Sequence, residues 1–375
     1  IKAWRKLCPG AVFAVAIEAT KGAIINALLE YDDIQIYPLN PAALASYRKA
    51  FAHGGGKNDP VDAKLLAQII ELYRKQIRPL KRNSELTRKI AVMAEDRRRL
   101  VDRRADFANE LTALLKGYFP AALALKPARS YSPFFLKFLQ KYPSLDKAKT
   151  AGTTRLRNFF HGVGAKGKAD NYVKTLTSAV PLTTDSATIE TSVLRVQAVI
   201  DQLMALTKHI KRSEQQLTKL LPQHDDFIVV KNLPGAAINM QARILAALGD
   251  DRSRYPNSES LQAASGIAPV TTQSGRQRFV NARWACTKFM KQTFHEYAGL
   301  SIDKSRWAKA YYEYHKGKNK SQRGAAQKAK RALAYKWQRI IYRLWIDGES
   351  YDEDRYIARL EATGSPLYKL LSKPG

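Results

Sequence analysis

Two aspartates three residues apart, Asp59 and Asp62, follow a glycine run in the stretch HGGGKNDPVDAKLLAQ (residues 53–68). In one interpretation they only start a helix: Asp59 is the N-cap, Pro60 takes the first helical position and Asp62 the capping-box position. The apolar residues that follow have helical spacing, which supports that interpretation. In the other, the two carboxylates are half of a metal site.

A third carboxylate, Glu18, ends the apolar run AVFAVAIE (residues 11–18), which predicts a buried strand. Residues 19–31 then predict a helix and residues 34–41 a second strand that runs into a turn. This order predicts a parallel crossover in an α/β domain, where ligands gather beyond the carboxyl ends of strands. Three carboxylates around one point require a cation, and Mg²⁺ suits phosphoryl transfer. A buried Glu18 paired with a lysine remains the alternative.

Ser274 is the candidate nucleophile. It lies in a Gly/Ser/Thr-rich loop predicted for residues 266–284, beside Gly275, Arg276 and Arg278. A serine there is usually only a turn residue, and no His–Asp pair is nearby to activate it. A serine that attacks a phosphodiester, however, needs cationic stabilisation of the phosphate more than a triad. The neighbouring arginines, including Arg283, provide that charge.

The composition indicates a polyanionic partner. The chain has 375 residues and 63 Lys and Arg against 33 Asp and Glu, a net charge of +30, so two or three domains and nucleic-acid binding are expected. Basic residues are spread along the whole chain, and no apolar run is long enough to span a membrane. Two cysteines exclude a disulfide framework and a cysteine-based zinc site and fit a reducing, cytoplasmic setting.

Two long basic helices are predicted, over residues 84–120 and 189–221, each with a heptad-like apolar stripe. They are expected to form a coiled-coil hairpin or a dimer contact. Surface arginines of such a pair are one interpretation of the basic residues, and nucleic-acid contact is the other. The residues concerned are Arg97, Arg98, Arg99, Arg103 and Arg104. The stretch between the helices, with a short helix near residues 132–148 and a glycine turn before another, does not indicate a function.

The last segment carries two further nucleic-acid signals. Residues 233–250 (LPGAAINMQARILAALGD) resemble a helix-hairpin-helix, in which a Pro-Gly turn offers backbone N–H groups to a phosphate. Residues 316–345 form a basic loop and helix with Lys318, Lys320 and Arg323 in the loop. The aromatic residues there either stack on bases or belong to a core: Tyr335, Trp337 and Tyr342. Residues 346–375 are predicted to be a weakly structured tail.

Three ordered motifs, IEATKG (17–22), NP (40–41) with GGGKNDPVDAKLLA (54–67), and LPG (233–235) with LQAASGIAPVTTQSG (261–275), resemble the insertion sequence 110 family of transposases. The resemblance implies an RNase H/RuvC-like N-terminal domain with a DEDD site, coiled-coil helices and a helical transposase domain with a catalytic serine. The changes of pattern along the chain place the expected domain boundaries at 1–83, 84–221, 222–346 and a tail 347–375. The family's first aspartate lies upstream of Ile1, so an N-terminal part is expected to be missing.

Matched to the family's motifs, Glu18, Asp59 and Asp62 are implied to bind Mg²⁺ (or Mn²⁺). Ser274 is implied to form the covalent ester with DNA, and Ser265 is the alternative serine if the alignment of that loop is shifted. It implies a structured noncoding guide RNA, donor and target double-stranded DNA, and a dimer or tetramer. The implied setting is a bacterial or archaeal cytoplasm, at the nucleoid during transposition. Two alternatives remain: a basic RNA- and DNA-binding scaffold with a decayed site, and a RuvC-type nuclease that uses only the carboxylates.

Overall fold

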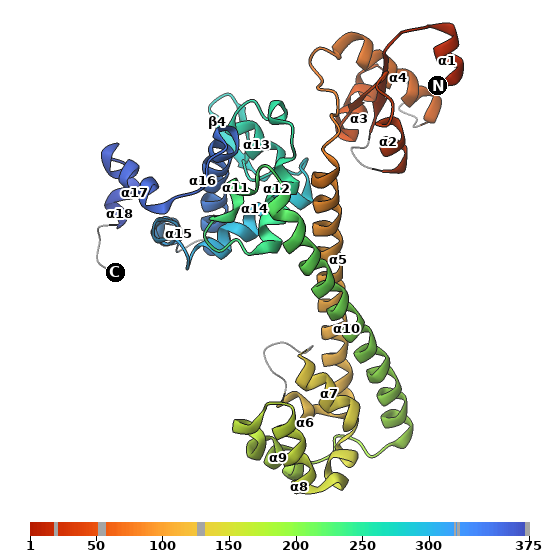
Figure 1. The fold of residues 1–375 in the computed structure, drawn as a ribbon, viewed down its shortest axis with the longest axis vertical. Coiled ribbons are helices and arrows are strands. Elements are labelled where there is room, and N and C mark those ends of the chain that lie inside the picture. Colours follow the sequence, from red (N-terminus) through yellow and green to blue (C-terminus); the bar gives the residue numbers. More distant parts are fainter. Residues whose placement is uncertain (19–21, 52–57, 126–131, 319, 321–322, 372–375) are drawn as a thin grey trace. The chain divides into compact units, whose positions relative to one another are not determined.

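The computed structural model describes residues 1–18, 22–51, 58–125, 132–318, 320 and 323–371. The predicted helix residues 19–21 and the glycine run 54–56 therefore lie outside the described residues. The chain forms two compact units, drawn in Figure 1. Unit 1 is Ile1–Glu85 with Gly249–Pro256, and unit 2 is Leu86–Leu248 with Asn257–Gly375.

Unit 1 is a small α/β unit. Its elements are α1 (Lys2–Leu7), β1 (Phe13–Ile17), α2 (Ala23–Leu28), β2 (Ile34–Pro38), α3 (Pro41–Phe51) and α4 (Asp59–Tyr73). The two strands pair in parallel, with Phe13 opposite Ile34 and Ile17 opposite Pro38, which confirms the predicted crossover. Alternate β2 residues Ile34 and Ile36 are buried with Ile25 of α2, because a strand turns every second side chain to the same face. Helix α3 was not predicted.

The segment 249–256, with the short helix η3 (Arg252–Arg254), completes unit 1 from far along the chain. The Asp250 carboxylate accepts a hydrogen bond from the Ser84 amide at 2.5 Å, and the Asn83 side chain accepts one from the Asp250 amide at 3.2 Å. Lys81 forms an ion pair with Asp251 at 3.2 Å. Polar contacts therefore fix residues 81–84 against this segment.

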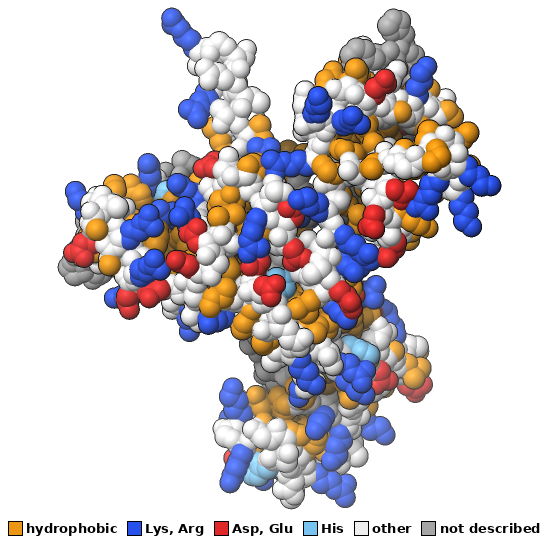
Figure 2. Space-filling model, turned by 45° about the horizontal axis from the view of Figure 1, so that its top comes forward, with side chains coloured by type: hydrophobic (Ala, Val, Ile, Leu, Met, Phe, Trp, Pro, Cys, Tyr) orange, Lys and Arg blue, Asp and Glu red, His pale blue; other side chains and the backbone are white. Residues whose placement is uncertain are grey.

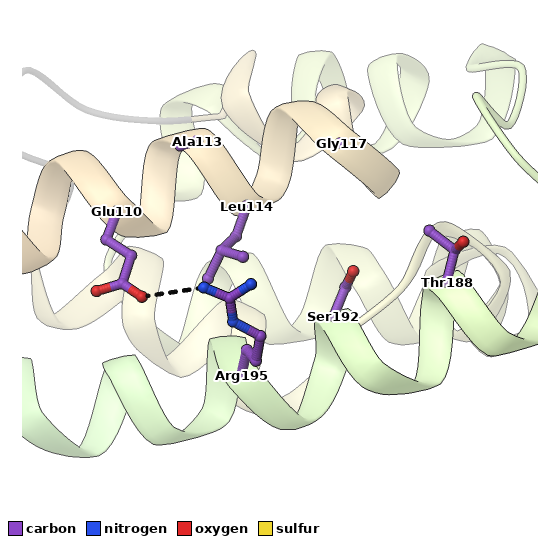
Figure 3. A pocket seen from close by; sticks show the side chains of 7 residues that line it. All are labelled: Glu110, Ala113, Leu114, Gly117, Thr188, Ser192 and Arg195. Atoms are coloured by element: carbon purple, nitrogen blue, oxygen red, sulfur yellow. Dashed lines mark hydrogen bonds and ion pairs between the residues drawn. The ribbon is translucent and has the colours of Figure 1, made fainter.

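Unit 2 is built on two long helices, α5 (Glu85–Tyr118) and α10 (Ser186–Leu220). Arg97 pairs with Glu214 (Nε–Oε1 2.9 Å), and further along α5 Glu110 pairs with Arg195 at 3.5 Å, so the helices run antiparallel (Figure 3). This confirms the predicted hairpin. Around the second pair lies an open groove of about 340 Å³ lined by residues of both helices.

A helical module follows α5 and precedes α10. It contains α6 (Pro120–Leu123), α7 (Pro133–Lys141), α8 (Leu145–Gly162), η1 (Lys166–Lys168) and α9 (Ala169–Ser178). Helix α7, the glycine turn and the helix after it, α9, were predicted, whereas α8 was not. The core of the module is aromatic: Phe138 is fully buried and its ring lies 6.2 Å from Phe119 and 5.7 Å from Phe160.

The remaining helices of unit 2 pack around tryptophans. They are η2 (Leu221–Gln223), α11 (Phe227–Lys231), α12 (Ile238–Leu248), α13 (Ser258–Ala264), α14 (Lys288–Ser301), α15 (Arg306–Lys318), α16 (Ala325–Asp347), α17 (Glu353–Ala362) and α18 (Pro366–Leu371). Trp307, Trp337 and Trp345 are fully buried. The prediction of a weak tail was wrong, because Tyr351 and Tyr356 pack against Trp307 and Trp337 and two helices follow residue 352.

Lysine and arginine side chains are scattered over the whole face shown in Figure 2, with carboxylates among them. This distribution agrees with the basic residues being spread along the sequence. Among the helices of the described residues, none combines the length and the apolar character needed to cross a membrane.

Replacing Phe138 with alanine should lower the free energy of unfolding by about 3–5 kcal/mol, because a buried aromatic ring is lost and a cavity remains. Phe279→Ala is the matched control, since Phe279 is 54% exposed against 0% for Phe138, and should change it by less than about 0.5 kcal/mol. Urea unfolding followed by circular dichroism measures both. Equal midpoints for the two variants would contradict the assigned aromatic core.

Candidate functional site

The predicted acidic residues all belong to unit 1. Glu18 follows the last residue of β1 directly and is exposed, so it is not the buried carboxylate of the alternative interpretation. Helix α4 contacts β1, and Asp59 and Asp62 both lie in the first turn of α4. Asp59 is exposed at the helix start, whereas only 9% of Asp62 is exposed.

Asn58, not Asp59, caps helix α4. The Asn58 side chain accepts a hydrogen bond from the Val61 amide at 3.0 Å, so Asp59 is the first helical residue and Pro60 the second. The predicted cap was wrong by one residue, because Asn and Asp serve equally well as caps and the sequence offers both in succession. The Asp59 side chain is thereby not needed for capping.

Asp62 is held by an arginine. Arg48 of α3 donates two hydrogen bonds to the Asp62 carboxylate, from Nε to Oδ1 and from Nη2 to Oδ2, each 2.7 Å long. Both side chains are only 13% exposed. A bidentate pair of this kind is among the strongest polar contacts in proteins, and it neutralises the carboxylate without a metal. Sequence reasoning missed Arg48, because nothing in the spacing of a lone arginine identifies a partner 14 residues away.

The structure does not bring Glu18, Asp59 and Asp62 into one metal-binding group. No cluster of three or more His, Cys, Asp or Glu side chains that could hold a metal occurs among the described residues, which include all three carboxylates. Their oxygens are the donors that Mg²⁺ prefers, so the residue types suit such an ion although the three carboxylates are not grouped. The metal assignment therefore stays a prediction.

Ser274 lies in a β-hairpin rather than in the predicted loop. Strand β3 (Val270–Ser274) pairs antiparallel with β4 (Gln277–Asn281), and Ser274 is opposite Gln277. Gly275 and Arg276 make the turn, and Gly275 has φ +56°, as a tight two-residue hairpin turn requires. The β-branched and aromatic residues of the two strands, VTT in β3 and FV in β4, favour extended structure. Ser274, Arg276 and Arg278 are all exposed.

Ser265, the fallback nucleophile, is fully buried at the end of α13. Its hydroxyl donates to the Gln262 carbonyl at 3.0 Å and accepts from Gln338 Nε2 at 2.7 Å. Gln262 and Gln338 are also fully buried. Of the two serines, only Ser274 is accessible to a DNA phosphate.

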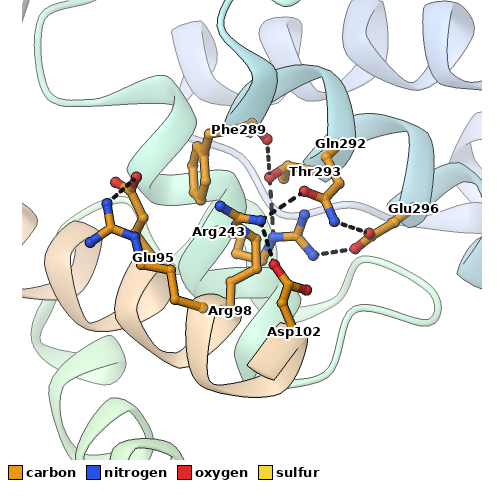
Figure 4. A network of polar contacts seen from close by, with 9 residues as sticks. Glu95, Arg98, Asp102, Arg243, Phe289, Gln292, Thr293 and Glu296 are labelled. Carbon is orange, nitrogen blue, oxygen red and sulfur yellow. Dashed lines mark hydrogen bonds and ion pairs between the residues drawn. The ribbon is translucent and has the colours of Figure 1, made fainter. Parts of the chain in front are cut away.

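The arginines of α5 make contacts within unit 2. Arg98 donates from Nη1 to Asp102 at 2.9 Å and to Gln292 of α14 at 3.3 Å, and Gln292 donates to Glu296 at 2.6 Å (Figure 4). Glu296 also pairs with Arg243 of α12. These contacts connect α5, α12 and α14. They assign Arg98 a structural role that does not depend on nucleic acid.

The other predicted nucleic-acid residues differ in exposure. Arg99 pairs with Glu95 at 3.2 Å, Arg104 is half-buried, and the following residues are exposed: Arg103, Lys318, Lys320 and Arg323. Trp337 belongs to the core, whereas Tyr335 and Tyr342 are half-buried. The predicted phosphate turn at Pro234–Gly235 packs closely on α14, because a Cβ at Gly235 would collide with the Leu300 carbonyl. A phosphate at that turn stays a prediction.

Comparison with known proteins gives two family matches. A model of DEDD transposases of the IS110 group, described as "Transposase", matches residues 3–120. A second model, "Transposase IS116/IS110/IS902 family", matches residues 229–313. The first match contains all three predicted carboxylates, and the second contains Ser274 and Ser265.

Three relatives agree with these matches. A Streptomyces coelicolor protein, named as a candidate mini-circle transposase for IS117, is 29% identical over 80% of this chain and 73% of its own length. The 42 kDa protein of insertion element IS900 from Mycobacterium paratuberculosis is 28% identical over 62% of this chain. The 44.8 kDa protein of IS116 from Streptomyces clavuligerus is 26% identical over 60% of this chain. The alignments span 57% and 55% of the latter two.

Replacing Arg48 with alanine should lower the free energy of unfolding by about 3 kcal/mol, because Asp62 is left nearly buried without a partner. The double variant Arg48→Ala/Asp62→Asn should recover part of that loss, and urea unfolding measures the coupling. If added Mg²⁺ raised the midpoint of Arg48→Ala but not that of the double variant, Asp62 would be a cation ligand. A single variant as stable as the wild type would show that the pair is unimportant.

Ser265→Ala should destabilise the protein by about 1–3 kcal/mol, because the buried Gln338 amide loses its acceptor. Ser274→Ala should change stability by less than about 0.5 kcal/mol, as an exposed substitution does. Thermal unfolding of both variants measures this contrast. The reverse order would refute the assignment of a structural role to Ser265.

Proposed function

Because this chain belongs to the insertion sequence 110 family of transposases, we propose that it cleaves and rejoins DNA with Ser274 as the nucleophile. The observation that supports this most is the setting of Ser274. It is exposed beside a hairpin turn, next to exposed Arg276 and Arg278. No Asp or Glu occurs between Glu259 and Glu296, so no carboxylate of this stretch repels an approaching phosphate.

The reaction is a transfer between two oxygens. The Ser274 hydroxyl oxygen forms a bond to phosphorus, the bond from phosphorus to the leaving deoxyribose oxygen breaks, and the hydroxyl proton is released as the leaving oxygen takes one up. The product is a phosphoserine ester that conserves the phosphodiester. Attack by a deoxyribose hydroxyl on this ester reverses the exchange and joins a new pair of strand ends.

Arg276, in the turn two residues after Ser274, supplies positive charge where the phosphoryl group gains negative charge. Guanidinium groups bind phosphate oxygens with paired N–H donors, and such contacts stabilise a transition state when they strengthen as charge develops. Arg278, opposite Gln273 in the register, lies on the other face of the ribbon and adds to the positive charge of the hairpin. The hairpin thus presents the nucleophile and the cations on one short segment.

The carboxylates of unit 1 are proposed as the site of a divalent cation, Mg²⁺ or Mn²⁺, in a RuvC-like domain. The support is the parallel strand pair with Glu18 at its end and the DEDD family match. Such an ion, when bound, polarises phosphate oxygens. Because Asp62 is paired with Arg48, we derive no step through the metal. The same pair favours the second candidate, a scaffold that binds nucleic acid without cutting it.

The proposed partners are donor and target DNA and a structured noncoding guide RNA, bound by a dimer or tetramer. The net charge of +30 supports polyanion binding. Three exposed basic residues shortly before α16 are proposed to contact the nucleic-acid phosphates: Lys318, Lys320 and Arg323.

Ser274→Ala should retain DNA and RNA binding and abolish strand cleavage, because only the attacking oxygen is removed. The protein is incubated with its element's noncoding RNA and end-labelled donor and target DNA. A denaturation-resistant protein–DNA adduct is then sought by gel electrophoresis. Thr271→Ala, an exposed hydroxyl of the same strand, is the control and should form the adduct.

An adduct that persists in Ser274→Ala would retire the proposed nucleophile. Mg²⁺-dependent nicking without any adduct would assign cleavage to the carboxylates alone. Binding without cleavage in the wild type would favour the scaffold.

A further inference from the structure

The β3–β4 hairpin is exposed on both faces. Every residue from Thr271 to Asn281 is exposed, so neither face of the ribbon packs on the rest of unit 2. A two-stranded hairpin without a packed face is at best marginally stable in water. We therefore expect this hairpin to be covered when the protein binds a partner.

The uncovered surface is aromatic and apolar. Phe279 is 54% exposed, Val280 63%, and Trp284, three residues beyond β4, 92%. By contrast, Trp307, Trp337 and Trp345 of the same unit are fully buried, and each indole N–H donates a hydrogen bond. The neighbouring core therefore accommodates indoles readily. The exposed position of Trp284 marks a binding surface rather than a shortage of core.

The charge of this surface identifies the chemistry of its partner. The stretch between Glu259 and Glu296 contains no carboxylate but five basic residues: Arg276, Arg278, Arg283, Lys288 and Lys291. An acidic partner with flat apolar rings complements this combination. Unpaired nucleic acid has both properties, because its bases stack on aromatic side chains while its phosphates bind cations.

The strand register places the aromatic surface next to the candidate nucleophile. Ser274 is opposite Gln277, and Phe279 lies two residues further along β4, opposite Thr272. Because side chains alternate between the faces of a ribbon, Ser274, Thr272 and Phe279 share one face. A base stacked on Phe279 therefore lies diagonally across the ribbon from the Ser274 hydroxyl.

We infer that the hairpin and Trp284 form a binding surface for an unpaired DNA segment at the cleavage point. Phe279 and Trp284 stack on bases, and Arg276 in the turn binds an adjoining phosphate, while Arg278 adds positive charge from the other face of the ribbon. The inference rests on the proposed function only for the position of this segment beside Ser274. The aromatic contacts require a strand whose bases are unstacked, which distinguishes this surface from one that grips intact duplex.

The test uses the full chain in a Ser274→Ala background, so that binding is measured without reaction. The probe is a single-stranded DNA oligonucleotide with one 2-aminopurine, compared with its duplex and with single-stranded RNA. Phe279→Ala and Trp284→Ala should each weaken single-strand DNA affinity by about tenfold, in the range for one stacked base. Both should restore 2-aminopurine fluorescence that the parent quenches, with an unchanged salt dependence, because the arginines remain.

Two control variants make the result specific. Trp284→Phe retains a stacking ring and should keep most of the affinity. Tyr314→Ala removes an aromatic ring that is 47% exposed on α15 and should leave binding unchanged. Because all these side chains are exposed, loss of folding does not mimic loss of binding; circular dichroism checks this.

Unchanged single-strand affinity in both alanine variants would overturn the inference. So would an equal loss for intact duplex, or a loss for RNA without one for DNA. A change in oligomeric mass with normal DNA binding would reassign the surface to a second copy of the chain. These outcomes are independent of the adduct assay: absence of a serine adduct would refute the nucleophile but leave the binding surface standing.

Discussion

The chain has only 33 Asp and Glu for 63 Lys and Arg, so many basic side chains cannot have a carboxylate of their own. The positions of the carboxylates therefore decide which lysine and arginine side chains the fold can bury. The nearly buried guanidinium group of Arg48 pairs with the Asp62 carboxylate, and that of Arg243 pairs with Glu296. An unpaired charge at such depth would cost several kcal/mol. The structured contacts between helices use these few acids, and the hairpin that carries Ser274 has none. The same scarcity thus accounts for paired arginines in the interior and for a basic hairpin without carboxylates.

Local pattern was sufficient for the regular elements. The parallel crossover and both long helices follow from apolar runs and from apolar residues that recur with helical spacing. Sequence reasoning failed where neighbours in sequence compete for one role and where residues far apart in the chain pack together. Asn58 displaced Asp59 as the cap, because either side chain can accept the same amide. The tail became two helices, because Tyr351 and Tyr356 find tryptophans more than 40 residues away in the chain, as the Trp307–Tyr351 hydrogen bond shows.

The sequence supplied candidate residues for the site but not their geometry. In the sequence, only the match to the family motif favoured Ser274 over Ser265. In the structure the two serines differ in exposure, because Ser265 is fully buried and Ser274 is exposed. The buried Ser265 hydroxyl accepts a hydrogen bond from Gln338, 73 residues later in the chain. Arg48 had no signal at all, since its partner is set by how α3 and α4 pack. The exposure of Phe279 and Trp284 was likewise invisible, because the sequence of an uncovered strand resembles that of a covered one. Long-range packing decides each of these properties.

The segment 249–256 has a consequence for synthesis. Unit 1 begins at the first residue, yet the acceptor of its Ser84 amide, Asp250, is made 166 residues later. At about 5–20 residues per second, the ribosome needs roughly 10–30 s to reach that point. The N-terminal unit therefore waits for most of unit 2 before its last contacts form. A nascent chain cut short before residue 249 carries the acidic residues on an incomplete unit 1, because residues 249–256 are missing from it.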